Sequence, residues 1–235
     1  MRKFYIYFIL LIFISCKAQK DNSTDVNHMN LIFEHWVEVD PVGIKSFPKM
    51  EEKIYSEEGI ANETDSTGIE KINVKSLADL IRETPKTKIF IEFKNDSIWR
   101  YTTERDIIIG DVFTLTKNNG NLDYRPKFER TKIYRTFDLF AQGDEYVVEM
   151  DKSKRKKILN YNCYYVKLTK IENENVEFYG QNTIYEMFVT ESVKLPIHSV
   201  INITKNFNEF FPLEIKISND KLNGAFEFYT ALEIK

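Results

Sequence analysis

The stretch FPLEIKISNDKLNGAFEFYTALEIK, residues 211–235, decides the fold class of this chain. Apolar and polar side chains alternate in residues 211–218, so the strand has one apolar face: Phe211, Leu213, Ile215 and Ile217. Residues 219–224 predict a turn, and a second strand follows. We expect its apolar face to hold Phe226, Phe228, Leu232 and Ile234, opposite Glu227, Tyr229 and Glu233. One buried face and one wet face are typical of an antiparallel sheet.

The same period of two recurs upstream, where it predicts further strands over residues 31–40, 88–94, 97–103, 106–116, 131–137, 145–150, 163–169 and 183–190. Turn residues separate several of them, as at Asn95-Asp96 and in residues 118–121. Polar residues 55–68 predict a loop. One short helix is predicted over Leu77–Glu83, between a cap at Ser76 and a stop at Pro85. Residues 197–208 suit either a helix or a strand. The fold class is therefore mainly β, of the α+β kind, with one or two short packing helices.

The N-terminus carries a different signal. Arg2 and Lys3 precede an apolar run from Phe4 to Ile14, which is shorter than the roughly 20 residues of a spanning helix. Ser15 and Cys16 follow, so the segment resembles a bacterial lipoprotein signal, with Phe13 in place of the usual leucine. We predict that residues 1–15 are removed and that the Cys16 thiol carries the lipid. The alternatives are a secretory signal with an incidental cysteine, or an uncleaved short anchor.

Domain organisation follows from this signal. Residues 16–30 are polar, without apolar periodicity, and predict a lipidated tether that includes His28; residues 31–235 predict a single β-rich envelope domain. The expected location is the envelope of a Gram-negative bacterium, and Lys17 after the lipidated cysteine agrees with an outer-membrane destination. If Cys16 is lipidated, Cys163 is the one remaining thiol, and we predict that it is a small buried hydrophobe.

Charge and motifs exclude several function classes. Without residues 1–15 the chain has 31 basic and 36 acidic residues, and this net charge of −5 gives no reason to expect nucleic acid as a partner. The sequence holds no common catalytic or nucleotide-binding motif. The three histidines, His28, His35 and His198, are too few and too scattered to predict a metal site. We therefore expect no cofactor, no metal and no catalytic residues.

Two surface features have competing interpretations. The basic run of residues 152–157 could approach anionic lipid headgroups, but an exposed hairpin tip before a strand at Ile158 is the favoured interpretation. The tyrosine-rich stretches could wall a lipid or glycan cavity, although core packing explains most of them.

A family resemblance covers residues 144–235. The stretch ILNYNC (158–163) resembles a strand start of small secreted proteins of the GLPGLI-motif type, with Asn160 at the position of their glycine. YEMFVT (185–190), Leu195-Pro196 and FPLE (211–214) resemble segments that follow in those proteins. They are similar in turn to the LolA-like lipoprotein-carrier fold. The resemblance implies a curved sheet, or half-barrel, with an apolar concave face, and it carries over no catalytic residue.

Three function classes follow. The first is a membrane-anchored, non-catalytic domain that binds an apolar ligand or a lipidated partner on the concave face. The second is a lipoprotein with a filled core, no small-molecule ligand and a role in protein interaction. A continuous apolar cavity would favour the first, and a packed core the second. The third, least favoured class is an enzyme, which would bring buried carboxylates together with His35 or His198 in a cleft.

Overall fold

The computed structural model describes residues 28–40, 85–141, 143–171, 182–220 and 224–235. They form one open antiparallel sheet of 11 strands, in the order β6-β5-β4-β3-β2-β1-β11-β10-β9-β8-β7. The strands are β1 (His28–Val39), β2 (Thr87–Lys94), β3 (Ser97–Glu104), β4 (Ile107–Thr116), β5 (Asn121–Arg125), β6 (Arg135–Asp138), β7 (Glu145–Ile158), β8 (Tyr161–Ile171), β9 (Thr183–Thr190), β10 (Phe211–Asn219) and β11 (Ala225–Ile234). The predicted mainly β, antiparallel and curved fold is confirmed.

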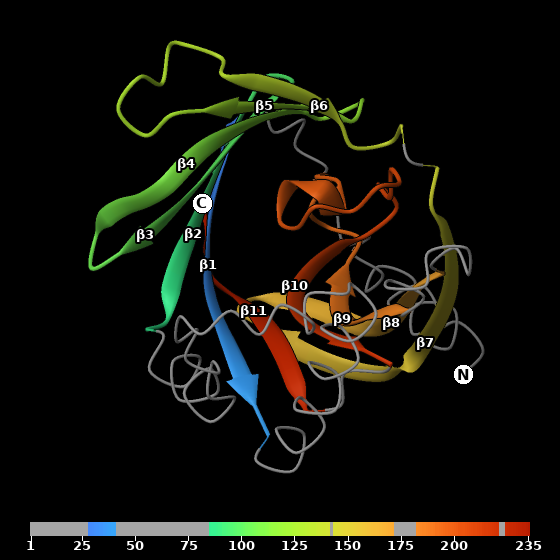
Figure 1. Ribbon diagram of the computed structural model, residues 1–235. Helices are drawn as coiled ribbons and strands as arrows, with labels where there is room; N and C mark the ends of the chain where they lie inside the picture. Colours follow the sequence, from blue (N-terminus) through green and yellow to red (C-terminus); the bar gives the residue numbers. More distant parts are fainter. Residues whose placement is uncertain (1–27, 41–84, 142, 172–181, 221–223) are drawn as a thin grey trace, which may run out of the picture.

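The sheet curls so far that its two edge strands approach one another (Figure 1). β1 pairs with β11, which joins the first and the last strands in the middle of the sheet. The edges are β6 and β7, and the chain crosses from one to the other through residues 139–144. We call β3–β6 the arch, and β7–β11 together with β1 and β2 the packed half.

Short turns set the strand boundaries. Asn95, between β2 and β3, and Leu159, between β7 and β8, both have positive φ, of 56° and 52°. Gly120 immediately precedes β5 and lies close to the end of β6. A Cβ atom built there would lie 2.6 Å from an oxygen of Asp138, so only glycine fits. The predicted turns at residues 95–96 and 118–121 are confirmed, but the short strand β5 was not predicted.

β10 has the predicted faces. In β11, Ile234 packs against the core as predicted, but Phe226, Phe228 and Leu232 lie on the face opposite to the predicted one. Phe211, Leu213 and Ile215 are fully buried. In β11 the buried side chains are Tyr229 and Ala231, while Leu232 is 43% exposed and Phe226 and Phe228 face outward beside Lys216. The register explains the error: Tyr229 lies opposite Ile215 on the concave side, whereas Phe228 pairs with Trp36 on the convex side. Hydrophobicity alone placed the aromatic rings on the wrong face, because the stacked ring pair of Trp36 and Phe228 shields apolar surface outside the core.

Two further boundaries differ from the prediction. β1 begins at His28, within the stretch predicted to be tether, and its Met29 is buried. The basic run of residues 152–157 lies within β7 rather than at a hairpin tip, and Ile158 ends that strand instead of starting the next. A bulge between Asp151 and Arg155 lets the polar run stay paired with β8 at a sheet edge, where charged side chains are well tolerated.

Among the described residues, the longest segment without a strand is the connection between β9 and β10, residues 191–210; we call it the inner segment. It contains one short 3-10 turn, η3 (Ile197–Ser199), and is otherwise irregular, so the ambiguous residues 197–208 form neither a full helix nor a strand. The predicted loop at 55–68, the predicted helix at 77–83 and the lipoprotein signal with Cys16 lie outside the described residues. In the part of the chain that the structure describes, no helix is long and apolar enough to cross a membrane.

Candidate functional site

The inner segment fills the concave side of the packed half. Its apolar side chains are all nearly or fully buried against the strands: Val193, Leu195, Ile197, Val200, Ile201, Ile203, Phe207 and Phe210. The sheet contributes Phe33, Leu213, Met187 and Val166, each at most 1% exposed. Such burial contributes about 1.5–3 kcal/mol for each large side chain. This half of the concave face is therefore closed by the protein's own chain.

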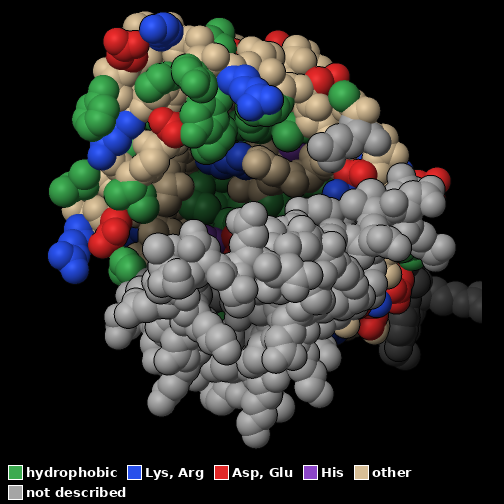
Figure 2. Space-filling model, in the orientation of Figure 1, with side chains coloured by type: hydrophobic (Ala, Val, Ile, Leu, Met, Phe, Trp, Pro, Cys, Tyr) green, Lys and Arg blue, Asp and Glu red, His purple; other side chains and the backbone are tan. Residues whose placement is uncertain are grey.

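The arch is covered much less. Leu115 and Leu122 are buried at its base, but Phe113 and Tyr124 are only half-buried and Phe137 is 37% exposed. These side chains share the inward face, because Phe113 pairs with Tyr124, and Leu122 with both Leu115 and Phe137. Figure 2 shows that the molecule is hollowed between the arch and the inner segment, with hydrophobic side chains in the hollow. We call this space the concave hollow.

An aromatic chain runs along the arch side of the hollow. The rings of Phe113 and Tyr124 meet edge to face with centroids 5.3 Å apart, and Tyr134 lies 6.3 Å further along. The Tyr124 hydroxyl donates to the Asp111 carboxylate, and this hydrogen bond raises the pKa of Tyr124. Apolar rings with an occasional polar group are the usual lining of a site for an apolar ligand.

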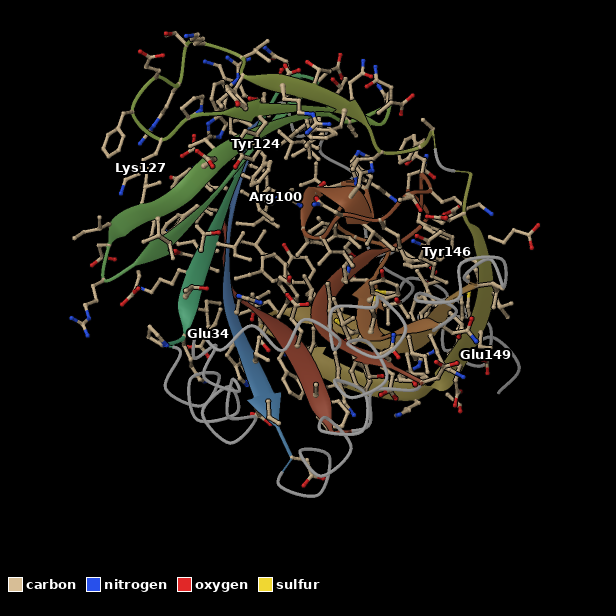
Figure 3. All side chains as sticks on the ribbon, in the orientation of Figure 1. Glu34, Arg100, Tyr124, Lys127, Tyr146 and Glu149 are labelled. Atoms are coloured by element: carbon tan, nitrogen blue, oxygen red, sulfur yellow. The ribbon has the colours of Figure 1, made fainter. Side chains whose placement is uncertain are left out.

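Arg100 of β3 lies where the arch meets the inner segment (Figure 3). Its side chain donates to the His198 carbonyl oxygen at 3.4 Å and to the Asn202 side-chain oxygen. Its guanidinium carbon lies 5.3 Å from the centre of the Phe113 ring. Arg100 is 7% exposed, and burial lowers its pKa to about 10, so it stays charged at neutral pH. This buried cation was not predicted from the sequence.

His35 forms the contact that the enzyme hypothesis required. Its Nε2 lies 2.8 Å from Glu227, which also accepts a hydrogen bond of 2.5 Å from the Tyr229 hydroxyl, and its Nδ1 lies 3.2 Å from the Thr87 hydroxyl. Burial acts to raise the pKa of Glu227, but the bonds from His35 and Tyr229 outweigh it and the pKa is lowered. Burial and the Glu227 charge raise the pKa of Tyr229. Glu34 pairs with Lys86 instead, as expected for the opposite face of the strand.

His198 does not join this group through any described contact. It is fully buried in η3, with Nε2 3.2 Å from the Thr116 carbonyl oxygen and an edge-to-face contact with Phe140. Burial and the nearby Arg100 lower its pKa, so the ring is neutral. Its role is to hold the inner segment against β4. Among the described residues, no group of three or more His, Cys, Asp or Glu side chains is placed to hold a metal ion.

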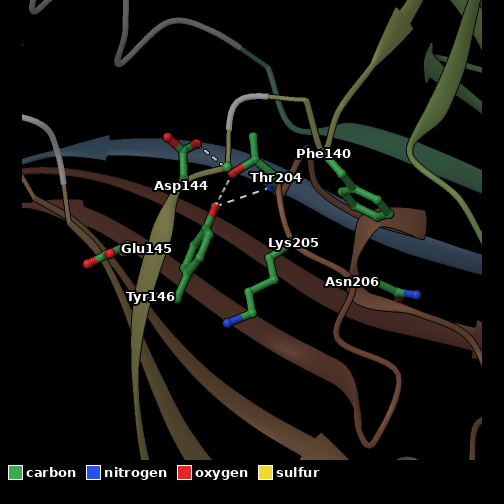
Figure 4. A pocket seen from close by; sticks show the side chains of 8 residues that line it. Phe140, Asp144, Glu145, Tyr146, Thr204, Lys205 and Asn206 are labelled. Carbon is green, nitrogen blue, oxygen red and sulfur yellow. Dashed lines mark hydrogen bonds between the residues drawn. The ribbon is translucent and has the colours of Figure 1, made fainter.

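A polar pocket of about 620 Å³ lies at the rim, where residues 140–146 meet residues 204–206 (Figure 4). Tyr146 donates to the Thr204 hydroxyl at 2.8 Å, and Thr204 donates to Asp144 at 2.5 Å. The Asp144 carboxylate also lies 2.9 Å from Lys170. Burial acts against the charge of Asp144, but these partners lower its pKa. This network fastens the inner segment to the start of β7.

The convex face carries a groove of about 420 Å³ between the outward aromatic rings of β1, β8, β9 and β11, lined among others by Trp36, Phe228, Phe188 and Tyr165. The basic run borders it: Lys154 lies 3.8 Å from the centre of the Tyr165 ring, and Lys156 pairs with Glu214 at 2.5 Å. Lys152 pairs with Glu191 at 3.0 Å. The lysines are thus partly neutralised, which weakens the headgroup interpretation of this run.

Cys163 is 1% exposed, and burial raises the pKa of its thiol. The predicted buried hydrophobe is therefore confirmed. Cys16 lies outside the described residues, and its lipidation stays a prediction.

No family model matches this chain, and no curated protein matches it. The solved structures that are similar to it include the following two. One is a LolA superfamily protein from Nitrosomonas europaea, 9% identical with a TM-score of 0.31, over 89% of this chain and 86% of that one. The other is a putative outer membrane lipoprotein-sorting protein domain from Vibrio parahaemolyticus, 8% identical with a TM-score of 0.33, over 89% and 85%. The GLPGLI-type resemblance stays a prediction.

Proposed function

We propose that this protein is a lipid-anchored, non-catalytic envelope protein that binds an apolar chain in the concave hollow. One observation carries the proposal: the arch keeps half-buried aromatic side chains on its inward face, while the rest of the concave face is filled by the inner segment. Burial of apolar surface is favourable by about 25 cal/mol per Å². A ligand that covers Phe113 and Tyr124 would therefore bind with a favourable contribution from the area that it buries.

The anchor rests on the sequence. Lipid on Cys16 would hold the domain beside a membrane, since each buried lipid CH₂ contributes about 0.8 kcal/mol and several chains give stable attachment. An outer-membrane location in a Gram-negative bacterium agrees with Lys17. Mass spectrometry of the intact protein from its native membrane tests this directly: the mass must correspond to a chain that starts at Cys16 and carries acyl groups. An unmodified Cys16 would contradict the anchor.

Ligand binding is tested with the Cys16→Ser variant, which carries no lipid of its own. We expect it to bind a fluorescent fatty acid and to retain small apolar molecules in native mass spectrometry. Phe113→Asn should weaken uptake at least about tenfold, because it removes an aromatic wall. Phe226→Asn is the matched control, since Phe226 is also half-buried but lies on the convex face. No uptake by the parent protein, or equal losses in both variants, would overturn the proposal.

A second candidate function is protein interaction at the β7 edge. β7 spans 14 residues at the end of the sheet, and Val147, Val148 and Met150 are 38–52% exposed. An edge strand offers unpaired backbone groups to a strand of another envelope protein. A photo-crosslinker at Val148 should then capture a partner in cells, and a crosslinker at Phe226 should not. Binding of the fluorescent fatty acid together with no crosslink would favour the first function.

A further inference from the structure

Arg100 carries a charge that none of the described side chains neutralises. Its hydrogen-bond acceptors, the His198 carbonyl and the Asn202 amide oxygen, are both uncharged. Within the described ranges, no carboxylate forms an ion pair with it. Tyr229 and His198 interact with it electrostatically, and both are neutral at pH 7. Arg125, another arginine of the arch, differs because it lies 3.6 Å from Asp123.

An unpaired buried cation is costly. The effective desolvation penalty is several kcal/mol per ion, and buried charges in proteins are normally paired. The 3.4 Å distance to the His198 oxygen is at the long end for a hydrogen bond, so this donor is weakly satisfied. A guanidinium has five N–H donors. Two of those of Arg100 form the hydrogen bonds to His198 and Asn202. The site therefore has both charge and donors to offer to an anion.

The position of Arg100 places this charge beside the concave hollow. The guanidinium lies over the Phe113 ring, and Phe113 contacts Tyr124, so the cation and the aromatic wall adjoin one another. Asn202, which accepts a bond from Arg100, is exposed, so the guanidinium lies within one side chain of solvent. Figure 2 shows basic as well as hydrophobic side chains in the hollow. A ligand with its chain along Phe113 and Tyr124 would bring its head to Arg100.

We propose that the concave hollow selects amphiphiles with an anionic head, a carboxylate or a phosphate, and that Arg100 binds this head. The inference rests on the proposed function and adds the chemical class of the ligand. A planar guanidinium is suited to the task, because it can donate two parallel hydrogen bonds to a carboxylate or phosphate. A neutral head of the same size would leave the charge of Arg100 unpaired.

The test compares ligands with one chain and different heads on the Cys16→Ser protein. Dodecanoic acid, dodecyl phosphate and dodecanol each compete with a bound fluorescent fatty acid, and inorganic phosphate is tested alone. We expect either the acid or the phosphate ester to bind at least about tenfold tighter than dodecanol, as one charge-assisted contact provides. Which of the two binds better identifies the head. Inorganic phosphate should not compete, because it lacks the chain.

Variants separate the site from general effects. Arg100→Met should bind dodecanol as the parent does and lose the preference for the anionic head, whereas Arg125→Met, on the outward face of the arch, should keep it. Arg100→Lys retains the charge and should keep part of the preference, which covers the case in which Arg100→Met does not fold. Equal binding of anionic and neutral heads by the parent would overturn this inference and leave the proposed function standing. Binding of no dodecyl compound would overturn both.

Discussion

The packed half and the arch are built from the same kind of strand, yet only one of them has a closed concave face. Both present apolar side chains inward at every second position, as Leu213 and Ile215 do in β10, and Phe113 and Leu115 in β4. The difference is the inner segment, which places eleven buried residues on the concave side of the sheet. A curved open sheet is therefore packed over one half and left partly exposed over the other, according to where one connection lies.

The largest effect is expected on the free energy of unfolding, when a phenylalanine is replaced by alanine in the packed half and in the arch. Phe211→Ala, at a fully buried position edge to face with Phe33, should lower the free energy of unfolding by about 3–5 kcal/mol. Phe113→Ala should lower it by about 1 kcal/mol, because that ring is only half-buried. Urea denaturation of both variants measures the two losses. Similar losses would mean that the arch is packed as tightly as the rest.

The next effect concerns the attachment of the inner segment. Tyr146→Phe removes the hydroxyl that donates to Thr204 and accepts from its backbone N–H, and should cost about 1 kcal/mol. Tyr101→Phe is the control, since its hydroxyl bonds Glu92 on the exposed face of the arch. Hydrogen exchange should quicken at Thr204 and its neighbours in the first variant only. Unchanged exchange there would show that the rim network does not hold the inner segment.

A smaller effect depends on pH. Glu227 has a lowered pKa in the folded protein, so it adds stability above the ordinary value of 4.5, and this is lost as the pH falls through the lowered pKa. His35 and Tyr229 are the groups that contact its carboxylate. Glu227→Gln should therefore be less stable than the parent at pH 6, and the two should converge as the pH falls below the lowered pKa of Glu227. Thermal melts across this range measure the difference. A constant gap at every pH would contradict the assignment.

The smallest effect is expected on the basic run of β7. Lys152→Ala breaks an ion pair with Glu191 in which both side chains are more than half exposed. Such pairs contribute about 0–1 kcal/mol, so we expect a change in stability of at most about 0.5 kcal/mol. The measurement is the urea midpoint in low and in high salt. A loss above 1 kcal/mol would show that this edge strand is stabilised by its charges.

The prediction of strands succeeded where alternation and turn residues agreed. Thr183–Thr190 and Ser97–Thr103 were located to within a residue, and the turn at Asn95 matches its positive φ. It failed where hydrophobicity and register disagreed, as at Phe228 and Tyr229. Aromatic rings that shield each other on a convex face look identical in sequence to rings in a core.

The candidate site was much less predictable. Arg100 lies between Trp99 and Tyr101 in a strand, with no motif around it, and its acceptors are about a hundred residues away in the chain. Glu227 was placed on the wrong face of its strand, so its contact with His35, 192 residues away, could not be foreseen. The sequence signal for Arg100 would have been a charged residue at an inward-facing position of a strand. Apolar and polar residues alternate too irregularly in β3 for the inward positions to be recognised.

Most of the strands, the antiparallel class and the lipoprotein-like signal could be predicted from the sequence, because periodicity, turn chemistry and the residues before Cys16 are local properties. The inward side of β11, the place of the inner segment and the surroundings of Arg100 follow only from the folded chain. Those depend on pairings across the whole chain, such as β1 with β11, and on which apolar face one long connection happens to cover.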